Sequence, residues 1–169
     1  MYYTLKLIIL LNPVVKDITV TVSDGTDPIT GATVTIGDDE ETTDSDGEAT
    51  FSSVYTGENT VSVTKSGYAD KTTTINVDES HTSFEIELEV VDTITITVDD
   101  GTDAIEGASV VIGETTKTTD ASGECTFTNM TYDDYSASVS KTGYTTKTET
   151  LQFRSNHKSF TISLEEADG

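Results

Sequence analysis

Acidic side chains between residues 38 and 47 are the first candidates for chemistry. Asp44-Ser-Asp-Gly47 imitates the start of a calcium-binding loop, and four further carboxylates directly precede it at positions 38–41. A calcium loop needs oxygen ligands at alternating positions and a bidentate glutamate that closes the site. The chain supplies no glutamate at that spacing, and the related stretch Asp120-Ala-Ser-Gly123 lacks the middle ligand. We therefore predict plain turns, with no metal and no other cofactor.

Histidines and tyrosines are the next candidates. His81 and His157 are 76 positions apart, and neither has a cysteine or a second histidine nearby in the sequence. Loop packing is therefore favoured over a shared metal site. Tyr132 and Tyr135 flank two aspartates, and because an amphipathic ring suits a contact surface, they are the candidates for a receptor-binding surface. A cation- or sugar-binding module stays an alternative, although the chain has no tryptophan to support sugar binding.

Catalysis and nucleic-acid binding find little support in the composition. No nucleophile has a base beside it in both halves of the chain, and there is neither a phosphate loop nor a pair of carboxylates in apolar surroundings. We therefore expect no enzyme activity. The formal net charge of −22 opposes contact with the phosphates of nucleic acid. The single cysteine, Cys125, aligns with Ala49 and is predicted to be buried and inert.

These residues are distributed over two copies of one domain. Residues 18–90 align with residues 94–166 at a constant offset of 76, and 35 of the 73 paired positions are identical. A fixed period of this kind indicates tandem repeats. Most shared residues are turn glycines and alternating apolar positions, so a feature present in both copies belongs to the fold. A repeat of this size can bury only one layer of apolar side chains, which leaves little room for a deep pocket.

Alternating apolar and hydroxyl residues predict seven short strands in each repeat. The first strand, Ile18–Val22, has its equivalent at Ile94–Val98, and period-two alternation buries one face. We interpret residues 42–47 and 118–123 as the turn of a hairpin whose return strand carries a phenylalanine inward. Seven such strands close into a two-sheet sandwich. The predicted core positions, in equivalent pairs, are Val20 and Ile96, Val34 and Val110, Phe51 and Phe127, Val63 and Val139, Phe84 and Phe160, and Ile86 and Ile162.

The order of motifs resembles a known group of β-sandwich domains. Each repeat has Asp-Gly after the first strand, then Ile-x-Gly-Ala-x-Val, Thr-Thr-Asp-x-x-Gly-Glu-x-x-Phe and Lys-x-Gly-Tyr. This order is similar to the carboxypeptidase-regulatory-like or transthyretin-like domain, a relative of Ig-like and Cna-B-like modules. The resemblance implies an all-β chain of two tandem seven-stranded sandwiches, at residues 17–90 and 91–169, after an N-terminal strand at residues 1–16. It implies little about function, because such modules serve as spacers, stalks and adhesive units.

An apolar segment precedes the first repeat. Ile8 and Leu10 make one face of this segment apolar, and Asn12-Pro13 ends the run. A strand that is apolar on both faces needs covering, so the segment is predicted to bind a protein partner by β-augmentation or to be held by its own first domain. It is too short for a membrane span and lacks the cleavage site of a signal peptide. The predicted partner-binding residues form the opposite face and are Tyr3, Leu5, Leu7, Ile9 and Leu11.

Tandem modules of this kind usually act outside cells, whereas we expect no export signal, sorting tail or anchor in this chain. A virus particle reconciles the two expectations, because virion proteins reach the outside by lysis. The leading hypothesis is therefore a non-enzymatic accessory protein of a phage or archaeal-virus particle: a head decoration, head fibre or tail-associated protein. The alternative is an extracellular or cell-surface subunit of a prokaryotic adhesin or pilus-like filament. In both settings we expect other structural subunits as partners and a homo-oligomeric chain, with no nucleic acid and no membrane span.

Overall fold

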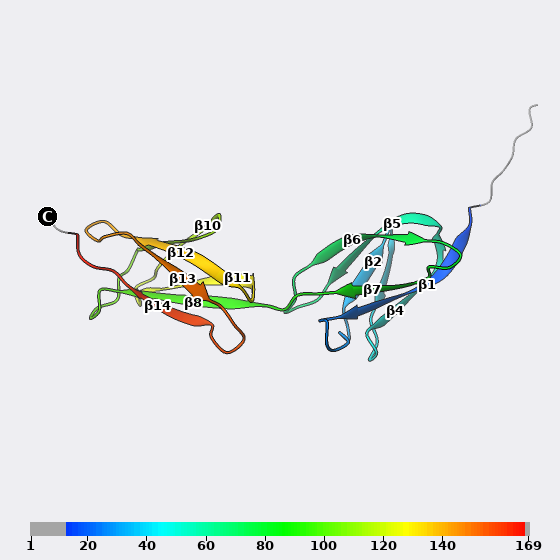
Figure 1. Cartoon of the computed structure of the whole chain (residues 1–169), viewed down its shortest axis with the longest axis horizontal. Helices are drawn as coiled ribbons and strands as arrows, with labels where there is room; N and C mark the ends of the chain where they lie inside the picture. The colour runs from blue at the N-terminus through cyan, green and yellow to red at the C-terminus, as the bar shows by residue number, and fades with distance from the viewer. Residues whose placement is uncertain (1–12, 168–169) are drawn as a thin grey trace, which may run out of the picture. The chain divides into compact units, whose positions relative to one another are not determined.

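The computed structural model describes residues 13–167, which divide into two compact units (Figure 1). One unit consists of residues 13–66 and 70–88, and the other consists of residues 67–69 and 89–167. All regular secondary structure in residues 13–167 is β-strand, and no helix occurs among them. The prediction of an all-β chain is confirmed for this part of the sequence.

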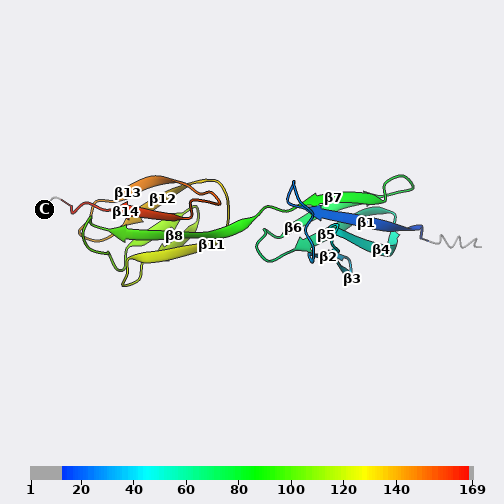
Figure 2. The same ribbon diagram turned by 90° about the horizontal axis from the view of Figure 1, so that it is seen from below.

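Seven strands make the first repeat a two-layer sandwich. One sheet has the order β4-β1-β7 and the other the order β3-β2-β5-β6. Figures 1 and 2 show the first of these sheets, which carries β1 and β4, on the opposite side of the repeat from β5 and β6. The strands are β1 (Val15–Ser23), β2 (Thr33–Ile36), β3 (Asp39–Thr42), β4 (Glu48–Tyr55), β5 (Gly57–Thr64), β6 (Lys71–Val77) and β7 (Ser83–Glu87).

The second repeat has the same seven strands in the same arrangement. Its sheets have the orders β11-β8-β14 and β10-β9-β12-β13, which correspond strand by strand to those of the first repeat. Two seven-stranded sandwiches were predicted, and this prediction is confirmed. The strands are β8 (Val91–Asp99), β9 (Ser109–Ile112), β10 (Thr115–Thr118), β11 (Glu124–Thr131), β12 (Asp134–Ser140), β13 (Lys147–Gln152) and β14 (Ser159–Ser163).

The first strand of each repeat is the centre of its three-stranded sheet. β1 pairs antiparallel with β4 and parallel with β7, so Val20 has Ala49 on one side and Phe84 on the other. Ile18, Val20 and Val22 are buried, whereas the threonines between them are only half-buried. This alternation follows from the pleat of the strand, which turns successive side chains to opposite faces. Hydroxyl residues can therefore occupy the outer face without any cost to the core.

The turn at residues 43–47 differs from the predicted hairpin. β3 pairs with β2 and β4 pairs with β1, so the strands before and after the turn belong to different sheets. β10 and β11 are separated in the same way, because β10 pairs with β9 and β11 with β8. The hairpin interpretation was wrong, because Asp-Gly turn chemistry specifies a reversal of the chain but not the sheet that the next strand joins.

A buried threonine fixes the position of this turn in both repeats. Thr43 Oγ1 donates a hydrogen bond to the carbonyl of Ile29 at 2.6 Å and accepts one from the N–H of Ala32 at 2.8 Å. Thr119 makes the equivalent two bonds at the same two distances. A buried hydroxyl without partners would be costly, so both hydrogen bonds are part of the reason why the turn crosses between the sheets here.

The core of each repeat is the single apolar layer that the sequence predicts. Ten of the twelve predicted core side chains are buried, and so is Cys125. Phe84 and Phe160 are only half-buried, which corrects the prediction for these two residues. Each lies on β7 or β14, an edge strand that, among the strands of residues 13–167, pairs only with the central strand of its sheet. The ring therefore lies at the rim of the sandwich and not in its middle.

Candidate functional site

The carboxylates that imitate a calcium loop are engaged in their own turns. Asp44 Oδ1 accepts hydrogen bonds from the N–H groups of Asp46 and Glu48 at 2.9 and 3.0 Å. Asp120 Oδ1 accepts the equivalent two bonds at 2.8 and 3.0 Å. The interpretation as plain turns fits this geometry. In residues 13–167, no three side chains of histidine, cysteine, aspartate or glutamate come together in a way that could hold a metal ion.

The ring of His81 contacts polar groups, whereas the ring of its equivalent, His157, packs on an aromatic ring. The Nδ1 atom of His81 lies 2.8 Å from Asp78 Oδ2 and 3.3 Å from Ser80 Oγ. The N–H of Ser80 and the ring of His81 donate to Asp78 and hold the pKa of that carboxyl well below its usual range. A catalytic relay needs serine and aspartate on opposite ring nitrogens, but here both contact Nδ1. His157 instead packs on Phe160, with ring centroids 4.4 Å apart.

Tyr132 and Tyr135 converge on Phe153. Their ring centroids lie 5.1 and 6.4 Å from that of Phe153, and both side chains are half-buried. Tyr135 donates its hydroxyl proton to the carbonyl of Thr131 at 3.0 Å, and Tyr132 donates to Asp92 Oδ2 at 3.1 Å. The hydroxyls are thus used within the second repeat, and only part of each ring is free to contact a partner. A receptor-binding role for these two tyrosines stays a prediction.

Asp92 is the centre of a polar cluster that the sequence reasoning missed. Its carboxylate accepts hydrogen bonds from the ammonium of Lys158, from the hydroxyl of Tyr132 and from the N–H of Thr93. The bond from Lys158 is the main reason why the pKa of Asp92 is lowered, and the same bond raises the pKa of Lys158. The cluster joins the start of β8 to the loop before β14.

The first repeat has an ion pair in the corresponding place with the charges reversed. Lys16 is the equivalent of Asp92, and its Nζ atom lies 2.9 Å from Oε1 of Glu79, in the loop before β7. No single repeat reveals such a pair in sequence, because its members are far apart along the chain. Comparison of the two copies would not have found the pairs either, because Glu79 aligns with Ser155 and Lys158 aligns with Thr82, so only the strand members of the pairs correspond.

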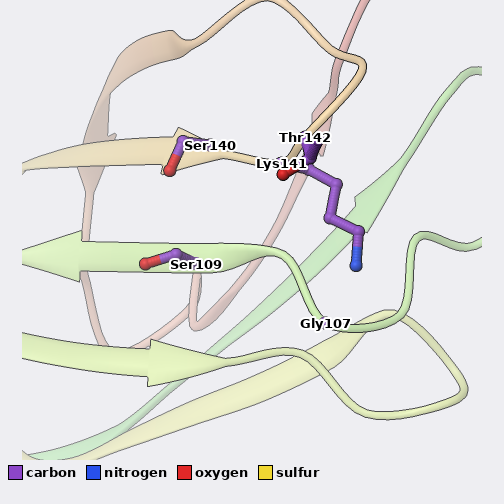
Figure 3. Close-up of a pocket in the computed structure, with 5 residues that line it drawn as sticks. All are labelled: Gly107, Ser109, Ser140, Lys141 and Thr142. Carbon is purple, nitrogen blue, oxygen red and sulfur yellow. The ribbon is translucent and has the colours of Figure 1, made fainter.

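Lys65 and Lys141 hold the turns before β2 and β9. Lys65 Nζ donates to the carbonyls of Thr30 and Gly31 at 2.6 and 3.0 Å, and Lys141 Nζ donates to the carbonyl of Glu106 at 2.6 Å. Both copies use the lysine in this way, so it belongs to the fold. The hollow beside Lys141 has a volume of about 460 Å³ and is lined by Gly107, Ser109, Ser140, Lys141 and Thr142 (Figure 3).

Apolar side chains gather where β1 begins. Val14 and Val15 are 55% and 38% exposed, and Tyr55 is 61% exposed. Val15 pairs with Tyr55, and the carbonyl of Val14 accepts the N–H of Thr56 at 2.9 Å, so these side chains lie at one end of the first repeat. We call Val14, Val15 and Tyr55 the apolar end patch. The predicted partner-binding residues that precede it lie outside the described residues and are Tyr3, Leu5, Leu7, Ile9 and Leu11.

The first repeat is similar to a known domain family. Residues 17–89 match the family model of the carboxypeptidase regulatory-like domain. The first repeat is therefore similar to the carboxypeptidase regulatory-like domain over its whole length. This confirms the resemblance drawn from the motifs, and the second repeat has the same strand order in both sheets. No curated protein matches the sequence. Within residues 13–167, no helix has the length and apolarity that crossing a membrane requires.

Several solved structures have a similar fold. The TIE protein of Bacillus anthracis has a TM-score of 0.43 at 18% identity, over 90% of this chain and 34% of its own. The streptococcal ancillary pilin has a TM-score of 0.46 at 13% identity, over 90% of this chain and 63% of its own. The shaft pilin SpaA of Lactobacillus rhamnosus GG has a TM-score of 0.45 at 14% identity, over 92% of this chain and 99% of its own. The present chain therefore spans about a third of the TIE protein's length and under two thirds of the ancillary pilin's length.

Proposed function

We propose that the chain is a non-enzymatic structural subunit that joins other subunits through its N-terminal segment, residues 1–16. The apolar end patch is the observation that carries this proposal. It holds three of the four large apolar side chains that are exposed in residues 13–167, and it directly follows the apolar segment. Apolar side chains that gather at one place on an otherwise acidic surface are typical of an interaction site.

The polar groups support a structural role over a catalytic one. The carboxylates of the acidic turns, the hydroxyls of both tyrosines and the ammonium groups of Lys65 and Lys141 all bond to groups of their own repeat. Such groups hold the sandwich together and are not free to act on a substrate. A subunit that contributes two rigid acidic modules to an assembly needs no further chemistry.

The setting that we propose is a cell-surface filament or adhesin, which makes the protein extracellular. A virion accessory role is the second setting, because an N-terminal docking strand would serve a particle equally well. The choice between a cell-surface filament and a virion is made by experiment. Immunogold labelling of producing cells separates the two settings, since a filament subunit is labelled along surface fibres, whereas a virion protein is labelled on particles released by lysis.

Deletion of residues 1–13 tests the docking role. We expect the shortened chain to stay folded and soluble but to lose its place in the native assembly, which co-purification with that assembly measures. Leu7→Asp should have the same effect, because a charge would enter the predicted apolar contact, whereas Thr4→Asp adds the same charge on the other face of the predicted strand and should be tolerated. Retention of the deletion variant in the assembly would refute the proposal.

A further inference from the structure

Each repeat ends by pairing with its own Lys-x-Gly-Tyr turn. In the first repeat, Ala69 N–H donates to the carbonyl of Glu89 at 2.8 Å and Val91 N–H donates to the carbonyl of Gly67 at 2.9 Å. Tyr68 and Val90 lie opposite each other between these bonds. We call residues 67–69 and 143–145 the turn segments. The exit segments are residues 89–91 and 165–167, which follow the last strand of each repeat.

The second repeat reproduces this register. Thr145 N–H donates to the carbonyl of Glu165 at 2.8 Å, Ala167 N–H donates to the carbonyl of Gly143 at 2.9 Å, and Tyr144 lies opposite Glu166. The backbone geometry is therefore shared, but the side-chain pair is different. An aromatic ring opposite a β-branched residue is a favourable cross-strand pair, and tyrosine opposite glutamate lacks that gain.

Charge also weakens the second exit segment. Glu165 and Glu166 line a hollow of about 500 Å³ together with Asp100 and Asp103, so four carboxylates lie around it. Like charges around one hollow repel one another. At the equivalent place in the first repeat, valine stands where Glu166 does. The second turn segment thus holds a less suitable partner than the first.

The start of the chain carries a better partner for that turn. Residues 13–15 are the equivalents of residues 89–91 at the offset of 76, and Val14-Val15 repeats Val90-Val91. Pairing uses the carbonyl of the first residue and the N–H of the third, so Pro13, which has no N–H, can occupy the first position. Val14 is 55% exposed, compared with 36% for Val90, which already faces Tyr68.

We propose that Pro13–Val15 of one copy pairs with Gly143–Thr145 of a second copy and displaces Glu165–Ala167 from that turn. Val14 then faces Tyr144, as Val90 faces Tyr68 within the chain. The contact joins two different surfaces, so it is directional and can continue from copy to copy. This inference rests on the proposed function and names the acceptor for the N-terminal end. The tethered exit segment competes with the incoming one, so the contact depends on protein concentration.

A disulfide trap tests the register. Residues 68 and 90 form a non-hydrogen-bonded antiparallel pair, in which Cα atoms approach to about 4.5 Å, within the range of a disulfide. We would introduce Val14→Cys and Tyr144→Cys with Cys125→Ala, since alanine stands at the equivalent position of the first repeat. Under oxidising conditions we expect a ladder of disulfide-linked copies that grows with protein concentration.

Three comparisons make the trap specific. Tyr68→Cys with Val90→Cys should crosslink within one chain at any concentration, which validates the geometry. Val14→Cys with Thr146→Cys places an exposed thiol two residues out of register and should form no ladder. Deletion of residues 165–169 removes the competing exit segment, so the Val14→Cys, Tyr144→Cys ladder should appear at a protein concentration lower by on the order of tenfold or more.

The outcomes separate this inference from the proposed function. A ladder that is equally strong with Thr146→Cys, or a ladder unchanged by removal of residues 165–169, would overturn the copy-to-copy contact. Absence of the ladder from a chain that still needs residues 1–13 for its native assembly would overturn the contact alone. If the chain assembles without residues 1–13, the proposed function is overturned as well.

Discussion

Each repeat has an ion pair between its first strand and the loop before its last strand, and the charges are exchanged between the two repeats. Lys16 and Glu79 tie the first strand of repeat one to the loop before its last strand, and Asp92 and Lys158 do the same in repeat two with the signs exchanged. The second pair gains a hydrogen bond from the hydroxyl of Tyr132. The comparison teaches that the same two elements are connected by an ion pair in both repeats, although the residues that form the pair differ.

The edge strands show a similar freedom. β3 contains three acidic residues and β10 contains none, although both are fully exposed edges of equivalent sheets. Charged side chains at an edge discourage pairing with other chains. β10 has only Lys117 for this purpose. Shared positions therefore report on the fold, and differences between the copies report on what each repeat does separately.

The largest expected effect comes from the aromatic cluster that only the second repeat has. Phe153→Ala should cost about 3–5 kcal/mol, because it removes a fully buried ring on which two tyrosines pack. Val77 is the equivalent residue of the first repeat, and Val77→Ala should cost about 1.6 kcal/mol at roughly 0.8 kcal/mol per methylene. Chemical denaturation, followed by hydrogen exchange in each repeat, measures both. Equal losses would show that the tyrosines add nothing to the second core.

Next in size are the buried threonines, for which the repeats should behave alike. Thr43→Val and Thr119→Val each leave a buried N–H and a buried carbonyl without their partner, and an unsatisfied buried group costs about 1–3 kcal/mol. Thr42→Val, at an exposed neighbouring position, is the control and should change stability little. A clear difference between the two buried variants in unfolding experiments would contradict the equivalence of the turns.

The sequence predicted the local features of the fold but not the contacts between residues that are distant in sequence. Alternation and turn glycines predicted the seven strands and most of the core, because both follow from local geometry. Gly47 has a φ of 76°, and a Cβ atom there would lie 2.5 Å from the carbonyl oxygen of Val22, so glycine is required. The sheet that β4 joins, the half-burial of Phe84 and the tie at Asp92 depend on contacts distant in sequence. No local pattern encodes such contacts.

Acid should weaken the second repeat through Asp92. Its pKa is lowered in the folded state, so the folded state binds fewer protons than the unfolded state near the unfolded value of about 3.9. The resulting stability is present above that value and is lost as the pH falls through the folded pKa. Asp92→Asn should therefore lower stability at pH 7, and by progressively less as the pH falls below about 3.9 towards the folded pKa of Asp92.

Denaturation of the second repeat at several pH values measures this effect. Glu114→Gln, which removes an exposed carboxylate outside the cluster, is the control and should not change the pH dependence. The raised pKa of Lys158 acts at high pH. The stability that Lys158 contributes is present below its pKa in the unfolded chain and is lost as the pH rises through its pKa in the folded protein. An Asp92→Asn variant with the acid sensitivity of the parent would show that the tie contributes no stability.

Calcium should have the smallest effect, and the two turns provide a matched test. Asp44 Oδ1 already accepts two backbone N–H bonds, as Asp120 Oδ1 does in a turn that lacks the middle carboxylate. Asp46→Ser gives the first turn the serine found at the equivalent position of the second. We expect a chelator to change the melting temperature only slightly at constant ionic strength, through general screening of the acidic surface, and by the same amount in parent and variant. A chelator effect that is large in the parent and absent from Asp46→Ser would mean that this turn binds calcium, and the repeats would then differ in function and not only in the sign of their charges.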